Sequence, residues 1–155
     1  MKITTLCYPE RDGKYLMLYR NRKKNDPNGG KWIGIGGHLE KGELPAECAV
    51  RELFEETGLH ADRMVLAGQI FFYSDEYEDE CMYLYRAEGL SGEVTDCDEG
   101  TLEWIEKERI PTRPMWEGDR LFLDLFFEGS KFFTMSLNYQ GDKLIDHKTV
   151  FESVI

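Results

Sequence analysis

Three glutamates stand at spacings that would place their carboxylates on one side of a helix. Glu55 and Glu56 follow Glu52 by three and four residues, and residues three and four apart share a face of an α-helix. Like charges placed in this way repel one another, which destabilises a helix unless a cation lies among them. Mg²⁺ and Mn²⁺ prefer such oxygen ligands and share their coordination sphere with phosphate oxygens and water. The spacing therefore indicates a divalent-metal site.

The element that must carry these glutamates is a helix at about residues 45 to 57. Pro45 suits the first turn of a helix, and Gly58 suits the left-handed position just past its end. Leu44 is a poor N-cap, because Ser, Thr or Asp is usual there, so the start is less well defined than the end. We expect an apolar stripe on the side away from the carboxylates, formed by Ala46, Ala49, Val50, Leu53 and Phe54.

Acidic residues that only keep a protein soluble would explain an ordinary Glu-Glu pair. The glutamates here belong to a longer pattern, Gly37-x5-Glu43-x7-Arg51-Glu52-Leu53-x-Glu55-Glu56-x-Gly58-Leu59. A chance match to the whole pattern in a chain of this composition has a probability of ~10⁻⁵ or less. At every defining position this segment resembles the signature of the Nudix hydrolases, which cleave nucleoside diphosphates linked to another moiety.

The resemblance implies an α/β fold of the Nudix type. This is an α/β/α sandwich in which the motif forms a loop, a helix and a loop against a mixed β-sheet. It also implies that Glu52, Glu55 and Glu56 ligate a divalent metal, Mg²⁺ or Mn²⁺. Arg51 would orient these carboxylates through an ion pair, and Gly58 would close the helix.

Further metal ligands follow from the resemblance. Gly37 lies in the turn before the helix, where it or Gly36 would offer a backbone carbonyl to the metal. The family often recruits a fourth carboxylate from outside the signature, and Glu99, just before an expected strand, is the candidate. Its neighbours Asp96 and Asp98 are equally consistent with a solvated acidic turn.

The rest of the chain is similar, more weakly, to the oxidised-purine nucleoside triphosphatases of this family. By that match Trp116 would stack on a purine and Asp119 would hydrogen-bond its edge, although Trp116 could equally anchor a second helix in the core. Ile33 and Gly118 depart from the subgroup, which carries a base-contacting Asn and the first of two adjacent Asp residues at these positions. The similar segments are Gly30-Lys31-Trp32, Gly34-x-Gly36-Gly37, Met115-Trp116-x-x-Asp119 and Asn138-Tyr139-Gln140-Gly141-Asp142.

Basic residues are needed to contact the phosphates of such a substrate. We favour Arg20, at the end of an expected second strand, with Lys31, Lys23 and Lys24 as alternatives. Each of these could instead be a solvated loop charge. His38 could also touch a phosphate, but a polar loop residue is the simpler interpretation.

Strand and helix signals alternate along the whole chain, which favours a single domain over residues 1–155 with a mixed sheet covered by helices. A polar loop is expected at residues 21–31, a strand at 100–106 and a second helix at 116–127. Three hairpins are expected, pairing residues 3–8 with 15–19, 64–73 with 81–87, and 131–139 with 143–151.

The acidic balance of the chain limits its partners. It holds 30 Asp and Glu against 19 Lys and Arg, a formal charge of −11, so the averaged field repels nucleic-acid polymers and anionic membranes. No apolar stretch approaches membrane-spanning length and no leader is recognisable, so we expect a cytoplasmic protein. The four widely separated cysteines are typical of buried, reduced thiols.

These observations predict a metal-dependent hydrolase that converts a nucleoside triphosphate to its monophosphate and pyrophosphate. A metal-activated water would attack a phosphorus, and either Glu52 or Glu55 would accept its proton. An oxidised purine triphosphate such as 8-oxo-dGTP is the substrate that the resemblance implies. The alternatives are the same chemistry on ADP-ribose or a nucleotide sugar, and a non-hydrolysing nucleotide sensor that regulates a partner.

Overall fold

The computed structural model describes residues 1–129 and 131–151. Its elements are β1 (Lys2–Arg11), β2 (Lys14–Tyr19), β3 (Trp32–Ile33), β4 (Ile35–His38), α1 (Pro45–Thr57), β5 (His60–Ser74), β6 (Glu80–Ser91), β7 (Thr101–Glu106), a 3₁₀ helix (Lys107–Thr112), α2 (Glu117–Glu128), β8 (Phe133–Gln140) and β9 (Lys143–Val150). The main sheet has the order β3-β2-β1-β6-β5-β8-β9, and β4 and β7 pair with β1 and β2. The pairs β1·β6 and β5·β8 are parallel while the others are antiparallel, so the predicted mixed sheet is confirmed.

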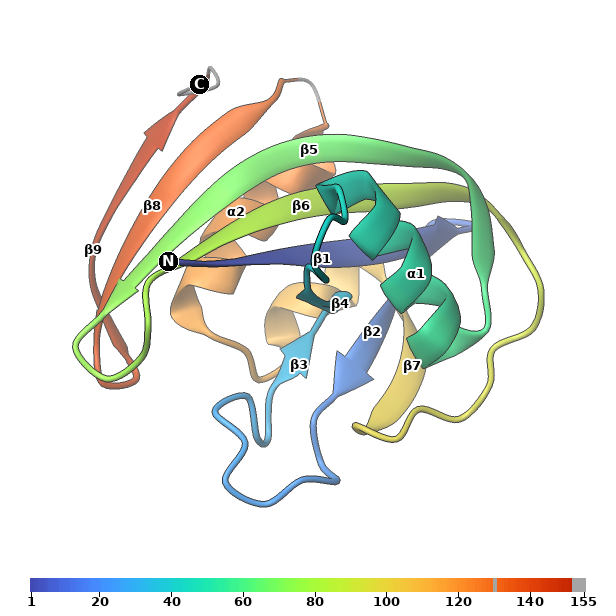
Figure 1. Cartoon of the computed structure of the whole chain (residues 1–155), viewed down its shortest axis with the longest axis horizontal. Coiled ribbons are helices and arrows are strands. Elements are labelled where there is room, and N and C mark those ends of the chain that lie inside the picture. The colour runs from blue at the N-terminus through green and yellow to red at the C-terminus, as the bar shows by residue number, and fades with distance from the viewer. Residues whose placement is uncertain (130, 152–155) are drawn as a thin grey trace.

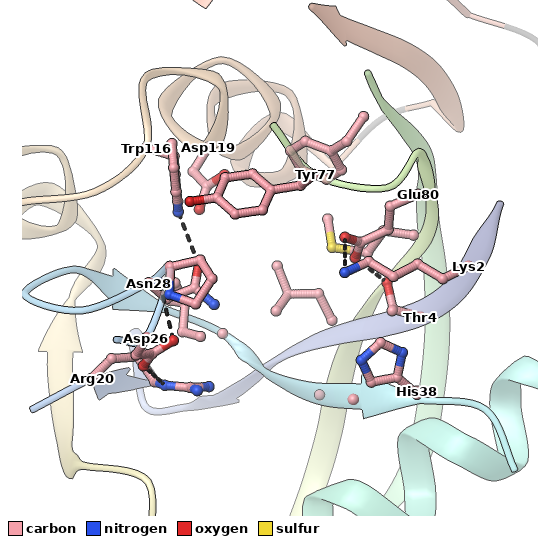
Figure 2. Close-up of a pocket in the computed structure, with 18 of the residues that line it drawn as sticks. Lys2, Thr4, Arg20, Asp26, Asn28, His38, Tyr77, Glu80, Trp116 and Asp119 are labelled. Carbon is pink, nitrogen blue, oxygen red and sulfur yellow. Dashed lines mark hydrogen bonds and ion pairs between the residues drawn. The ribbon is translucent and has the colours of Figure 1, made fainter. Parts of the chain in front are cut away.

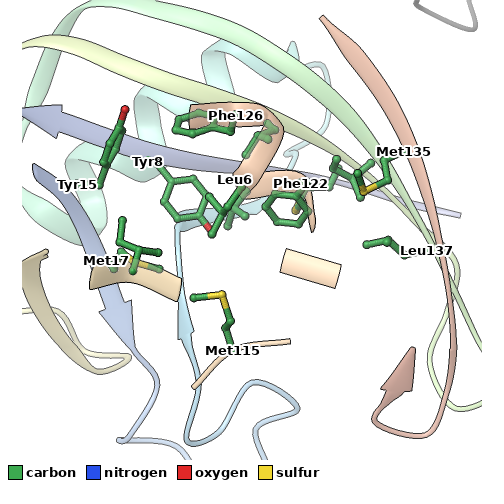
Figure 3. Packing of buried hydrophobic residues seen from close by; sticks show 14 of the residues in the cluster. Leu6, Tyr8, Tyr15, Met17, Met115, Phe122, Phe126, Met135 and Leu137 are labelled. Carbon is green, nitrogen blue, oxygen red and sulfur yellow. The ribbon is translucent and has the colours of Figure 1, made fainter. Parts of the chain in front are cut away.

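The two helices lie on opposite faces of this sheet, α1 in front of it and α2 behind it in the view of Figure 1. Strand β1 shows why, because successive side chains of a strand point to opposite faces. Tyr8 packs against Phe126 of α2, with ring centroids 5.5 Å apart, in the cluster of Figure 3. Its neighbour Cys7 packs instead in a second cluster with Leu53 of α1. Each face thus has its own core, as an α/β/α arrangement requires.

Hairpins join β1 to β2, β5 to β6 and β8 to β9, as predicted. The pairing in the first is wrong, however, because only Glu10 and Arg11 of β1 pair with β2, whereas residues 4–7 pair with β4. At the first turn Asp12 and Gly13 both have positive φ, 51° and 77°, which suits the tight turns that join antiparallel strands. Helix α2 and strand β7 lie within one residue of their predicted positions. Strand β5 is longer than the predicted strand and begins at His60, shortly after α1. The sequence did not predict its first residues because they are polar and show no alternation of apolar side chains.

Helix α1 begins and ends where the sequence predicts. Gly58 has a φ of 81°, and its N–H donates to the carbonyl oxygen of Phe54 at 2.8 Å, which is the expected left-handed cap. At the other end the backbone N–H of Leu44 donates to Oε1 of Glu47 at 2.8 Å. The Glu47 side chain therefore caps the N-terminus of the helix in part, although Leu44 has no side-chain oxygen with which to do so.

The predicted apolar stripe of α1 is partly wrong. Ala46 is exposed, and Val50 and Phe54 keep 49% and 50% of their surface accessible, whereas Ala49 and Leu53 are buried as predicted. The helix turns its Cys48 and Glu56 side toward the sheet in place of the exposed residues. This orientation is possible because β4 has glycines opposite the inward-facing glutamates, which leave room for their side chains. The N–H of Gly36 donates to Glu56 and so offsets the cost of burying its carboxylate.

The four cysteines are free and buried, in agreement with the prediction. Over residues 1–129 and 131–151 there is no helix with the length and apolarity needed to cross a membrane.

Candidate active site

Glu56 is the most deeply buried of the three motif glutamates, with 9% of its surface exposed. Its Oε2 accepts the backbone N–H of Gly36 in β4 at 3.0 Å. This approach needs glycine in β4, because a Cβ on Gly36 would lie 1.8 Å from the carbonyl oxygen of Thr5 in β1. The close pairing of β1 with β4 therefore sets where the Glu56 carboxylate lies.

Glu52 lies one helical turn earlier and faces the next residue of β4. A Cβ on Gly37 would lie 2.8 Å from Oε1 of Glu52, so the absence of a side chain there gives the carboxylate its room. Burial raises the pKa of Glu52, and the hydrogen bond from Arg51 opposes that shift. The Glu52 carboxylate is therefore partly removed from water and held in place by Arg51.

Arg51 connects the motif carboxylates to one another. Its Nε and Nη2 donate to the two oxygens of Glu43 at 2.7 and 3.0 Å, and its Nη1 donates to Glu52 at 2.7 Å. The same Nη1 reaches Glu55 at 3.1 Å, although that side chain is 55% exposed. The guanidinium lowers the pKa of Glu43 to about 2. This forked contact has the orienting geometry that the sequence predicts for Arg51.

Glu99, from the loop before β7, lies beside Glu56. Burial, a hydrogen bond shared with Glu99 and the nearby carboxylates raise the pKa of Glu56 well above its usual range, while the pKa of Glu99 is lowered. Glu99 also pairs with Arg20 at 3.4 Å and with Lys23 at 3.1 Å. The neighbouring Asp96 and Asp98 are exposed. Of the three acidic residues considered for this position, the fold thus brings Glu99 to the motif.

This donor set suits a hard divalent cation in its chemistry. The Glu99 carboxylate raises the pKa of both Glu52 and Glu56, and this repulsion is the cost that a cation among the three would remove. Within the described ranges, however, no three His, Cys, Asp or Glu side chains are already arranged as metal ligands. The carboxylates are turned toward Arg51 and toward one another, so binding a cation requires side-chain rotation.

One cavity of about 520 Å³ joins this carboxylate cluster to helix α2. Gly36, Glu56 and Glu99 line one end, and Trp116 and Asp119 line the other, which Figure 2 shows facing Tyr77 and Asn28. The volume is in the usual range for a site that binds a small molecule. Segments that are far apart in the sequence therefore line one continuous site.

Trp116 stands at the N-cap of α2 and belongs both to the core and to the cavity wall. Its ring meets Tyr139 edge to face at 5.3 Å, and its Nε1–H donates to Oδ1 of Asn28 at 2.9 Å. Asp119 lies one turn into the helix and is only 5% exposed, and burial raises its pKa to about 8. The two interpretations of Trp116, core anchor and cavity wall, are thus compatible.

The basic residues fall in different places. Arg20 lines the cavity, but its Nε is held by Asp26 at 2.7 Å. Lys31 lies over the indole of Trp116, with Nζ 4.4 Å from the ring centroid. Lys23 and His38 also line the cavity, whereas Lys24 is exposed.

Sequence reasoning missed a polar group on the cavity wall between β1 and β6. Thr4 donates to Oε2 of Glu80 at 2.6 Å, and Lys2 pairs with Oε1 of the same residue at 3.6 Å (Figure 2). β1 and β6 are parallel partners, with Lys2 opposite Glu80. A sequence pattern gives no sign of this register, because the two strands are far apart along the chain. Asn28 was missed as well, since it lies in a polar loop of ordinary turn composition.

Comparison with known proteins agrees with this architecture. Residues 2–126 match the model of the NUDIX domain. An "Oxidized purine nucleoside triphosphate hydrolase" of Danio rerio is 33% identical over 95% of this chain and 93% of its own length. The uncharacterized Nudix hydrolase YvcI of Bacillus subtilis is 32% identical over 81% of this chain and 78% of its own.

Solved structures show the same fold. The crystal structure of a MutT protein from Bacillus halodurans superposes with a TM-score of 0.88 and 25% identity, covering 99% of this chain and 100% of that one. A MutT Nudix hydrolase from Burkholderia pseudomallei gives a TM-score of 0.70 and 26% identity over 80% of this chain and 96% of its own. From the motif, the fold and these matches, the chain belongs to the Nudix hydrolase family.

Proposed function

We propose that this chain hydrolyses a purine nucleoside triphosphate with an oxidised base, such as 8-oxo-dGTP, to the monophosphate and pyrophosphate. The observation that carries the proposal is the single cavity that joins a carboxylate cluster to an indole and a buried carboxyl group. The Danio rerio relative, named as an oxidized purine nucleoside triphosphate hydrolase, supports the same substrate class. The cytoplasm, where triphosphate pools lie, is the compartment that fits this role.

The carboxylate end would bind the metal and the phosphates. Glu52, Glu55 and Glu56 would hold Mg²⁺ or Mn²⁺, with Glu99 and the carbonyl oxygen of Gly37 as further ligands. A divalent cation there would lower the pKa of the attacking water and neutralise charge on the phosphate oxygens. The ion pair of Arg20 with Glu99 at 3.4 Å supports Arg20 as the residue that would contact the phosphates.

Arg51 limits where the proton acceptor can be. Its Nη1 donates to Glu52 at 2.7 Å and to Glu55 at 3.1 Å, so one guanidinium orients the oxygens of both carboxylates beside the expected metal site. Either can take the proton from the water, as the sequence predicts. Arg51 therefore acts through these two residues, by fixing the orientation of their oxygens.

The helix α2 end would recognise the base. Trp116 offers an aromatic face for stacking and Asp119 a carboxyl group for the purine edge, and Lys31 lies against the indole. The departure at Gly118 has a steric reason, because a Cβ there would lie 2.6 Å from Leu137 and 2.7 Å from the hydroxyl of Tyr139. The Gly118 N–H also donates to that hydroxyl at 2.8 Å. Position 118 therefore supplies no second carboxyl group for the base.

A substrate panel with Mg²⁺ tests the proposal. Pyrophosphate release and kcat/KM are measured for 8-oxo-dGTP, dGTP, dATP and dCTP, and product formation for ADP-ribose and a nucleotide sugar. We expect pyrophosphate release, fastest with the oxidised purine. Preferential cleavage of ADP-ribose or a nucleotide sugar would replace the proposed substrate, and nucleotide binding without any turnover would favour a sensor.

A further inference from the structure

Asn28 lies in the loop between β2 and β3 and lines the cavity near helix α2 (Figure 2). Its side-chain oxygen accepts the Nε1–H of Trp116 at 2.9 Å, across 88 positions of sequence. An indole nitrogen can only donate. The contact therefore fixes which end of the carboxamide is oxygen and leaves the Nδ2 amino group at the other end.

The backbone of Asn28 is held from both sides. Its N–H donates to Oδ1 of Asp26 at 3.0 Å, and its carbonyl oxygen accepts the N–H of Lys31 at 3.0 Å. Asp26 is in turn fixed by Arg20, whose Nε donates to its other oxygen at 2.7 Å. The carboxamide is therefore positioned before any ligand arrives, which lowers the entropy cost of a contact with it.

The Nδ2 group donates to no protein atom within the part of the chain that the structure describes. A half-buried amide on a cavity wall with its oxygen occupied presents only donors to a ligand. Its neighbours on that wall differ, because Ile33 has no polar atom and a protonated Asp119 can both donate and accept. Asn28 can thus distinguish a hydrogen-bond acceptor from a donor on a ligand.

We propose that Asn28 is a specificity-determining residue, whose Nδ2 group donates to a carbonyl oxygen on the edge of the bound base. The inference rests on the proposed function, since it assumes a purine nucleotide in this cavity. It predicts a preference for 6-oxopurines such as guanine over 6-aminopurines such as adenine, because guanine has an acceptor where adenine has a donor.

The test replaces the amide by a carboxylate. Asn28→Asp keeps an oxygen for Trp116 but exchanges the free donor for an acceptor. Binding of dGMP and dAMP is measured by calorimetry, which requires no turnover. We expect the ratio of the two dissociation constants to shift toward adenine by about 10-fold or more, in the usual range for a specific base contact. The added charge weakens both nucleotides alike, so it cancels in the ratio.

Two further variants isolate the cause. Asn25→Asp places the same charge on an exposed residue of the same loop and should leave the ratio unchanged. Trp116→Phe removes the N–H that fixes the carboxamide, which can then present either end, and should reduce the preference toward equality. The melting temperature of each variant shows whether it is folded.

An unchanged ratio in folded Asn28→Asp, or a change as large in Asn25→Asp, would overturn the inference. Failure of the proposed function would give a different result. In that case the wild-type protein would release no pyrophosphate from any triphosphate. A shifted binding ratio in an enzyme that prefers some other purine nucleotide would still assign the base contact to Asn28.

Discussion

The two ends of the cavity each hold a buried carboxyl group on the inward side of a helix, and they stabilise it differently. Glu56 on α1 lies against Glu99 and Glu52 and accepts the N–H of Gly36. Asp119 on α2 is affected by one carboxylate, Glu80, which raises its pKa, and by two cations, Arg120 and Lys31, which lower it. Burial raises the pKa of both residues.

The difference separates chemistry from recognition. A cluster of carboxylates repels itself, and only a multivalent cation relieves all its members at once. A buried carboxyl group with one carboxylate near it is relieved by a single proton and becomes a neutral hydrogen-bonding group. The α1 end is therefore suited to bind a metal and phosphates, and the α2 end to bind an uncharged base.

Removing one charge from the cluster should have the largest effect. Glu56→Gln should lower kcat at least about 10²-fold on every triphosphate, because one metal ligand is lost with little change in shape. Added Mg²⁺ should raise the melting temperature of the wild-type protein but not that of the variant. Glu47→Gln, which keeps an oxygen for Leu44 on the same helix, is the control. Full activity in EDTA would contradict the metal assignment.

The kinetic effect of truncating Trp116 or Asp119, at the α2 end of the cavity, should depend on the base of the substrate. Trp116→Ala should raise KM for purine triphosphates by a factor that corresponds to about 1 to 3 kcal/mol of binding free energy, the usual contribution of stacking on an aromatic ring. The effect on dCTP should be smaller. Asp119→Ala should change the order of preference among purines more than the rate on dCTP. Values of kcat/KM for 8-oxo-dGTP, dGTP, dATP and dCTP provide the measurement. Equal losses on all four would make these residues structural.

A methyl group on β4 should disturb the cluster without unfolding it. Gly37→Ala meets the end of the flexible Glu52 side chain at 2.8 Å, so Glu52 must move while the backbone stays. We expect kcat to fall about 10-fold, since small displacements of reacting groups are costly, with a melting temperature near that of the wild type. Gly36→Ala is the contrasting variant, because it meets the backbone of Thr5 at 1.8 Å and should lower the melting temperature.

The proton on Asp119 should appear in the pH dependence of stability. Its pKa is about 8 in the folded chain against an ordinary value of 3.8, so the folded state binds a proton that the unfolded state releases between those pH values. Its contribution to stability therefore falls as pH rises from about 4 to 8 and is constant above.

Asp119→Asn cannot titrate and lacks this dependence. The free energy of unfolding of the wild type, relative to the variant, should fall by at least about 1 kcal/mol between pH 5 and 8. The ceiling for one proton over these pH units is about 4 kcal/mol, at about 1.4 kcal/mol per unit, and the opening of the cavity to water reduces the effect. Asp124→Asn, on the exposed side of the same helix, should remain parallel to the wild type. A difference independent of pH would mean that Asp119 is ionised in the folded protein.

The sequence by itself determined the features that depend on near neighbours along the chain. The bounds of α1 follow from Pro45 and Gly58, and the hairpins follow from their turn residues, because capping and turn geometry involve residues within four positions. The shared side of Glu52 and Glu56 follows from the helical period in the same way.

Only the tertiary structure decided which groups meet across the cavity. Val50 and Phe54 face solvent rather than the core, because the glycines of β4 accept the glutamate side of α1 in their place. Glu99 meets Glu56, and Asn28 meets Trp116. These contacts join segments of distant sequence whose positions are set by strand pairing and by the packing of two cores, and neither leaves a local pattern in the residues themselves.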